Sequence, residues 1–115
     1  MEKFDLTNEL AAQDMICLIM KDKNLSLEQA IKFAICKTIF KLIDETGWAG
    51  IALDLWGHAE YDREWETLSS PIIEIELDDL QNNLIKLIMA KSKVNKETAL
   101  GYFLIFVMEE LGYHI

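Results

Sequence analysis

The sequence has few of the residues that lock a fold covalently or interrupt its helices. In 115 residues it contains two cysteines, one proline and five glycines. Cys17 and Cys36 both lie in apolar helical runs. We therefore expect buried, reduced thiols rather than a disulfide, which would require an oxidising compartment. A chain of this length can bury a stable hydrophobic core without disulfides or bound metals, so we expect one domain over residues 1–115.

Long apolar segments are also missing. The first ten residues, MEKFDLTNEL, contain no apolar core of the kind that a signal peptide has. The longest unbroken apolar run covers residues 99–108 and is too short to span a bilayer. We therefore expect a cytoplasmic protein that neither spans nor binds a membrane.

Positive charge is the third shortage. The chain has 11 basic and 20 acidic residues, which gives a formal net charge of −9. Nucleic-acid binding without sequence preference needs lysine and arginine against phosphates, so the composition argues against it. Binding to an anionic membrane surface is disfavoured for the same reason. The negative charge favours a basic protein partner instead, or simply serves solubility.

The motifs of common catalytic and metal sites are absent. There is no glycine-rich phosphate loop, no nucleophile elbow and no Ser/His/Asp pattern. Asp54 and His58 are four residues apart and could share a helix face, but the chain lacks the clusters of a zinc site and the glycine turn of a calcium loop. We expect no enzyme, no metal and no other cofactor. The alternative is an enzyme with a carboxylate site at Asp54 and His58.

Apolar residues at helical spacing predict an all-α fold of about five helices. The predicted helices extend from Thr7 or Asn8 to Met20, from Ser26 to Gly47, from about Ala49 as far as Thr67, from Asp78 or Asp79 to about Lys91, and from Asn95 to the residues before Gly112. Ser26 and Gln29 form a predicted capping box. The last helix is apolar nearly all round, so we expect it to be central.

Two parts of the chain resemble each other at an offset of 69 residues. Residues 16–35 and 85–104 both consist of a helix, a lysine-containing turn, a polar cap and a second helix. Internal duplication would explain this likeness, and so would the general pattern of helical hairpins. In either case we expect two packed helical hairpins with an acidic, partly helical and partly extended insert between them.

The excess negative charge is concentrated in residues 54–79, hereafter the acidic segment. It contains nine acidic residues and one basic residue, so its net charge is −8, whereas the rest of the chain is nearly balanced at −1. Trp56, at its start, lies on an apolar helical stripe with Trp48, Ile51 and Leu55, and we expect it in the core. After Pro71, apolar and acidic residues alternate as in a strand. No partner strand is predicted, so we expect a connector or an edge that pairs with another molecule.

The acidic segment is the candidate interface. Tryptophan and tyrosine are frequent interface anchors, and carboxylates around them steer a basic partner. The candidate partner-binding residues are Asp54, Glu60, Tyr61, Asp62, Glu64, Trp65, Glu66, Glu74 and Glu76. Asp78 and Asp79 suit a helix N-terminus better. The alternative is that these acids form only a solvated face.

A small, acidic, helical chain with a carboxylate and aromatic segment resembles bacterial immunity proteins and antitoxins of contact-dependent or colicin-type systems. In addition, KNLSLEQAIKFAICKTIFKLIDETGW, residues 23–48, is similar to small helical proteins found beside toxin genes. The resemblance implies that the protein binds a basic toxin, such as a nuclease, and covers its active-site cleft. Two alternatives stay open: a structural or adaptor protein that forms a homodimer through residues 73–77, and a phage-type inhibitor that mimics nucleic acid.

Overall fold

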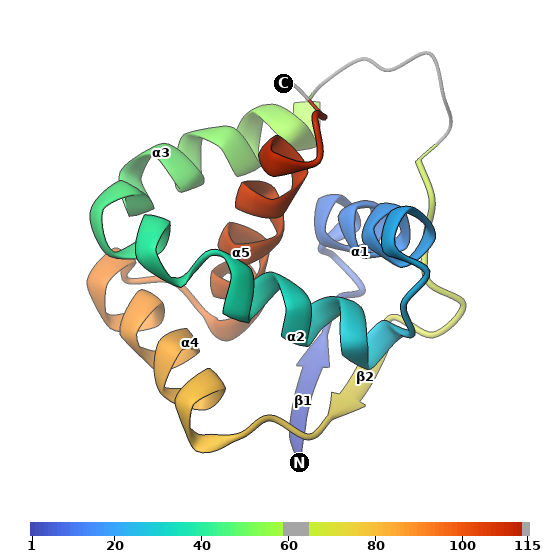
Figure 1. Ribbon diagram of the computed structural model, residues 1–115, viewed down its shortest axis with the longest axis horizontal. Helices are drawn as coiled ribbons and strands as arrows, with labels where there is room; N and C mark the ends of the chain where they lie inside the picture. Colours follow the sequence, from blue (N-terminus) through green and yellow to red (C-terminus); the bar gives the residue numbers. More distant parts are fainter. Residues whose placement is uncertain (59–64, 114–115) are drawn as a thin grey trace.

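The computed structural model describes residues 1–58 and 65–113, and for residues 39–45 and 57–58 it describes the backbone alone. The elements are, in chain order, β1 (Glu2–Asp5), α1 (Leu10–Lys23), α2 (Leu27–Lys37), α3 (Ile39–His58), β2 (Ile72–Ile75), α4 (Asp79–Ser92) and α5 (Lys96–Glu110) (Figure 1). Five helices and one small two-stranded sheet in this part of the chain confirm the all-α prediction.

Helix α5 is the central element, as its all-round apolar sequence predicted. Every residue from 99 to 108 is buried, and the helix packs against α1, α2, α3 and α4 (Figure 1). Trp48 of α3 stacks on Phe106 with ring centroids 5.4 Å apart. The rings of Trp56 and Tyr113 form a T-shaped pair whose centroids are 6.5 Å apart. Trp56 is fully buried, so its predicted place in the core is confirmed.

The strand after Pro71 has a partner within the chain, so the prediction that it lacks one is wrong. β2 pairs antiparallel with β1, and the N–H of Leu6 extends the ladder by donating to the Pro71 carbonyl at 2.9 Å. Phe4 and Ile73 face the core from the two strands. The sequence conceals this pairing because β1 has only four residues and lies about 70 residues from β2.

The two predicted hairpins are present, and their turns have the same backbone conformation. Asn24 after α1 and Lys93 after α4 both have φ of 54°, in the left-handed region. The backbone N–H of Asn24 donates to the Met20 carbonyl, and that of Lys93 donates to the Met89 carbonyl. These pairs are related by the 69-residue offset seen in the sequence, so the likeness between the halves extends to turn geometry.

The caps that follow the two turns are also equivalent. The Ser26 side chain accepts a hydrogen bond from the N–H of Gln29 at 3.3 Å, and the Asn95 side chain accepts one from the N–H of Thr98 at 2.8 Å. The Gln29 side chain accepts from the Ser26 N–H in return, which confirms the predicted capping box. The second helix of each hairpin, α2 or α5, therefore begins with the same kind of N-cap hydrogen bond.

The sheet adds a third correspondence that the sequence comparison did not include. Phe4 and Ile73 are directly opposite each other in the antiparallel ladder, and they are themselves 69 residues apart. The strands are thus related by a local two-fold axis through this pair. Each half consists of one strand and two helices in the same order, with α3 and residues 59–71 between the halves. This arrangement favours internal duplication over a chance likeness of helical hairpins.

Several helix boundaries differ from the predicted ones. α2 ends at Lys37 rather than Gly47, because the Thr38 hydroxyl donates to the Ala34 carbonyl at 2.8 Å and competes with the helical ladder. α3 then continues through Gly47, which does not adopt a positive φ. Residues 65–67, expected to be helical, have no regular secondary structure.

The start of α1 also differs from the prediction. α1 begins at Leu10 with Glu9 as its cap, rather than at Thr7 or Asn8. Thr7 is used one turn earlier: its N–H and its hydroxyl both donate to the Asp5 carboxylate, at 3.1 and 2.6 Å. The Thr7 hydroxyl therefore stabilises the turn between β1 and α1 and does not cap α1.

The cysteines are free thiols, as expected, but they are less buried than predicted. Cys36 is exposed, and Cys17 is half-buried. Burial raises the pKa of the Cys17 thiol, and the nearby carboxylates of Glu66 and Asp14 act in the same direction. Among the described residues, no helix is both long and apolar enough to cross a membrane.

The matched turns give a paired stability test. Left-handed backbone strains a lysine more than an asparagine, and glycine removes the strain while losing more entropy on folding. We expect Lys93→Gly to raise the free energy of unfolding by about 0.5–1 kcal/mol and Asn24→Gly to raise it less. Urea denaturation measures both. Loss of stability in Lys93→Gly, or a larger gain in Asn24→Gly, would contradict this description of the turns.

Candidate functional site

The structure brings together only some of the predicted partner-binding residues. Glu60, Tyr61, Asp62 and Glu64 lie outside the described residues. Asp54 and Trp65 line the same cavity, and Glu66 follows Trp65 directly. Glu74 and Glu76 are exposed beside the buried Ile73, Ile75 and Leu77, and they do not line that cavity.

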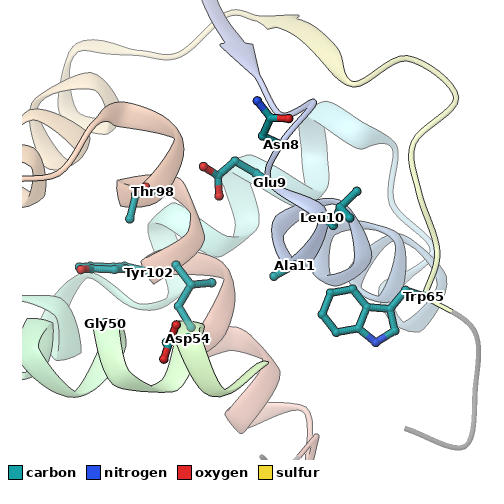
Figure 2. Close-up of a pocket in the computed structure, with 10 residues that line it drawn as sticks. Asn8, Glu9, Leu10, Ala11, Gly50, Asp54, Trp65, Thr98 and Tyr102 are labelled. Atoms are coloured by element: carbon teal, nitrogen blue, oxygen red, sulfur yellow. The ribbon is translucent and has the colours of Figure 1, made fainter. Parts of the chain in front are cut away.

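The cavity, hereafter the acidic cleft, has a volume of about 440 Å³. It lies between the start of α1, the middle of α3, the first half of α5 and the side chain of Trp65 (Figure 2). Its lining residues are Asn8, Glu9, Leu10, Ala11, Gly50, Leu53, Asp54, Trp65, Thr98 and Tyr102. Among the described residues, the lining thus contains two carboxylates, two aromatic rings and no lysine or arginine.

Asp14, on α1, positions the chain next to the cleft. Its side chain is completely buried. One carboxylate oxygen accepts a hydrogen bond from the Trp56 indole N–H at 3.3 Å, and the other accepts from the backbone N–H of Glu66 at 3.1 Å. A buried carboxylate is stable only with such partners. Asp14 therefore links α3 and the acidic segment to α1 and determines where Trp65 lies.

Gln13 makes the second attachment. Its amide NH₂ donates to the Leu6 carbonyl at 2.7 Å, and its amide oxygen accepts from the backbone N–H of Leu68 at 2.9 Å. At the surface, Lys21 forms an ion pair with Glu66. Residues 65–68 are thus held along α1 by two buried side chains, and the half-buried ring of Trp65 packs against the core at the edge of the cleft.

In the cleft, the charged form of the Glu9 carboxylate is destabilised by its surroundings. It caps α1, but its side chain makes no capping hydrogen bond. Burial raises the pKa of Glu9, and the negative charge of Glu97 adds to that effect. Glu97 is held on β1, since it accepts a hydrogen bond from the Asp5 N–H at 3.2 Å. Carboxylates with pKa values raised in this way are frequent at binding and catalytic sites.

Tyr102 and Gly50 form the floor of the cleft between α5 and α3. Tyr102 is 7% exposed, and Figure 2 shows it reaching over Gly50. A Cβ atom at position 50 would lie 2.9 Å from the Tyr102 hydroxyl oxygen, which is closer than real Cβ contacts. Glycine inside a helix costs about 1 kcal/mol relative to alanine. Here the missing side chain leaves room for the hydroxyl.

Sequence patterns offer little indication that Glu9 and Tyr102 belong to a site. Glu9 belongs to a polar stretch next to the start of the first helix, and Tyr102 lies within the apolar run 99–108 that predicts a buried helix. Both enter the cleft only because β1 and α5 bring residues about 90 positions apart into one place. A tyrosine within an apolar helical run is the one signal in the sequence, because its hydroxyl needs a polar surrounding.

A second, apolar groove lies on α3. Trp48, Ile51 and Leu55 were expected to pack inwards, but they are 41%, 64% and 50% exposed. They line a cavity of about 260 Å³ together with Tyr113. The predicted stripe is therefore only partly correct: Trp56 faces the core together with Ala49 and Ala52, whereas Trp48, Ile51 and Leu55 lie at the surface.

Glu76, just after β2, lies next to α2. The Glu28 carboxylate accepts a hydrogen bond from the backbone N–H of Glu76 at 2.9 Å, and this bond lowers the pKa of Glu28. Within residues 1–58 and 65–113, no group of three or more His, Cys, Asp or Glu side chains is placed to hold a metal ion. The acidic cleft is therefore the candidate site that geometry supports.

The raised pKa of Glu9 gives a pH-dependent prediction. The folded state disfavours the charged carboxylate, so the penalty is present above the pKa of Glu9 and disappears as the pH falls below it. We expect Glu9→Gln to be more stable than the wild type at neutral pH, by at most about 0.5 kcal/mol because solvent screens the charge of a half-buried group. The gain should shrink towards about pH 4, where glutamates become protonated.

Urea denaturation at several pH values measures this effect. Glu74→Gln is the matched control, because it removes one negative charge from an exposed site outside the cleft. A Glu9→Gln variant that is less stable than the wild type at neutral pH, or that gains no more than the control, would contradict the electrostatic description of the cleft.

Comparisons of this chain with protein-family models, with curated proteins and with solved structures give no match.

Proposed function

We propose that this protein is an immunity protein or antitoxin that binds a basic protein toxin, such as a nuclease, and covers its active-site cleft. The observation that carries the proposal is the acidic cleft, whose described lining includes Glu9, Asp54, Trp65 and Tyr102 and no lysine or arginine. A toxin that cleaves nucleic acid needs basic residues to bind phosphates. An acidic surface with aromatic anchors is complementary to such residues.

The distribution of charge supports this proposal. The acidic segment carries −8 of the net charge of −9, and two of its residues, Asp54 and Trp65, line the cleft. Carboxylates that surround an anchor raise the rate of encounter with a basic partner and select against acidic ones. Because Trp65 is held by the attachments of residues 65–68 to α1, it can contact a partner with little loss of entropy.

The proposal predicts that a basic toxin is encoded beside this gene. It is tested with that toxin in a nuclease protection assay and a binding titration. Reversing the charge of three acids of the segment, in a Glu60→Lys, Asp62→Lys, Glu64→Lys variant, should weaken binding at least about tenfold and reduce its salt dependence. Glu66 is left intact, because its ion pair with Lys21 holds the segment in place.

The matched control reverses three exposed acids elsewhere, in an Asp22→Lys, Glu109→Lys, Glu110→Lys variant. These residues lie near the far ends of α1 and α5, away from the cleft. Affinity should change much less in this variant, since the same change in net charge falls outside the interface. Equal effects of the two variants, or affinity that ignores salt, would contradict the proposal.

A structural or adaptor protein that forms a homodimer is the second candidate. The pairing of β2 with β1 removes the original reason for it, but the exposed apolar side chains of Trp48, Ile51 and Leu55 provide another. A stable dimer in light scattering without any ligand would favour this candidate. A monomer that associates only with the toxin would favour the immunity function.

A further inference from the structure

We propose that the apolar groove between α3 and the C-terminal end of α5 binds an amphipathic helix of the partner. The apolar face of that helix lies in the groove, and its basic residues lie at the acidic edge. This inference deepens the proposed function, and it rests on that function for the identity of the partner as a basic protein. The groove is separate from the acidic cleft, since the two have no lining residue in common.

One wall of the apolar groove has exposed apolar side chains at the spacing of a helix face. Trp48, Ile51 and Leu55 all line the groove, are exposed, and follow one another at intervals of three and four residues. Side chains at this spacing form a stripe along a helix, and such a stripe packs against a second helix. A partner helix with apolar residues at the matching spacing therefore fits this wall.

Contacts within the protein hold the shape of the groove. Trp48 stacks on Phe106 of α5, and Tyr113 forms a T-shaped pair with the buried Trp56, so the two aromatic rings that line the groove have fixed positions. The buried Ala52 lies between them and leaves space for side chains of a partner. The groove, of about 260 Å³, is thus formed before binding, which reduces the entropy lost when a partner docks.

The end of α5 gives the groove an acidic edge. Glu109 lines the groove, and the last turn of α5 contains Glu109 and Glu110 but no basic residue. The C-terminal end of a helix is itself negative, so it favours nearby cations over carboxylates. Within residues 1–58 and 65–113, neither glutamate forms an ion pair. A lysine or arginine beside the apolar face of the partner helix supplies the complementary charge.

The same charge disfavours a second copy of this chain in the groove. In a two-fold dimer the same surface of both copies meets, so the glutamates at the two edges would approach each other, and each copy has a net charge of −9. A standard interface also involves about 20–30 residues on each side, whereas seven described residues line the groove. The groove therefore suits one basic helix better than an identical acidic chain.

The groove lies beside the acidic cleft on the same helix. Gly50 and Asp54 line the cleft, and the residues that directly follow them, Ile51 and Leu55, line the groove. A partner that covers the cleft therefore reaches the groove across α3. In such a complex the carboxylates steer the partner, and the groove supplies the apolar contact area.

The test uses the full chain and synthetic peptides of about 18 residues, which form about five helical turns. The basic peptide has leucines on one helix face and lysines on the other. The acidic peptide has glutamates in place of the lysines, and the scrambled peptide has the composition of the basic one without an apolar face. We expect the basic peptide to bind with a Kd of about 10–100 μM and the other two at least about tenfold more weakly. In ¹⁵N chemical shifts, the basic peptide should shift the amides of Ile51, Leu55 and Tyr113.

Two double variants of matched chemistry locate the interaction. Ile51→Ser, Leu55→Ser removes apolar side chains from the groove and should weaken binding of the basic peptide at least about tenfold. Leu80→Ser, Leu87→Ser removes apolar side chains from α4, outside the groove, and should change the Kd by less than about twofold. All four side chains are exposed, so both variants should fold, which far-UV circular dichroism checks.

The acidic edge is tested by a separate pair of variants. Glu109→Gln should weaken binding of the basic peptide about threefold at low salt, and the difference from the wild type should shrink at high salt. Glu74→Gln is the control, because it removes the same charge from an exposed position outside the groove. Equal effects of the two variants would contradict the charge complementarity of the groove.

Four results would overturn the groove as a site for a basic helix. They are absence of binding by the basic peptide, equal binding of the acidic or scrambled peptide, chemical shifts confined to the acidic cleft, and equal effects of the two serine variants. A dimer in light scattering that Ile51→Ser, Leu55→Ser dissociates and Leu80→Ser, Leu87→Ser does not would also overturn it, because a second copy then occupies the groove.

Binding of the toxin separates this inference from the proposed function. If Ile51→Ser, Leu55→Ser leaves toxin binding intact while the Glu60→Lys, Asp62→Lys, Glu64→Lys variant abolishes it, the groove proposal fails and the proposed function stands. If the basic peptide binds in the groove but no toxin binds the chain, the proposed function fails instead.

Discussion

The buried carboxylate of Asp14 joins the parts of the molecule that form the candidate site. It accepts hydrogen bonds from Trp56 of α3 and from the backbone of Glu66, so one side chain of α1 fixes both a core tryptophan and the chain beside the cleft. Gln13 adds the corresponding bonds to Leu6 and Leu68. Buried polar groups of this kind are stable only when fully satisfied, so any displacement of residues 65–68 leaves buried groups unpaired.

The acidic cleft forms where the asymmetric part of the chain meets the symmetric part. The two halves, each with one strand and two helices, are related at the sheet by the Phe4 and Ile73 pair. α3 and residues 59–71 have no counterpart in this pattern. The cleft takes walls from α1 of the first half, from α5 of the second half, and from α3 and Trp65 of the insert. The insert thus contributes two of the parts that line the acidic cleft, α3 and Trp65.

The elements with strong local signals could be predicted from the sequence. Ser26 and Asn95 mark helix starts, and the apolar run of α5 marks the central helix, because caps and periodicity are local properties. The pairing of β1 with β2 could not be predicted, since a four-residue strand depends on a distant partner. Asp54 and Trp65 were recognised as candidates by charge and aromatic content, whereas Glu9 and Tyr102 join them only through long-range packing.

Hydrogen exchange at the backbone amides of Glu66 and Leu68 tests most directly whether buried side chains of α1 hold the acidic segment at the cleft. Both N–H groups donate to such side chains, one to Asp14 and the other to Gln13, although they lie outside any helix or strand. We expect each amide to exchange at least about 100-fold more slowly than in an unstructured peptide. Exchange of both amides at the rate of an unstructured peptide would contradict the account.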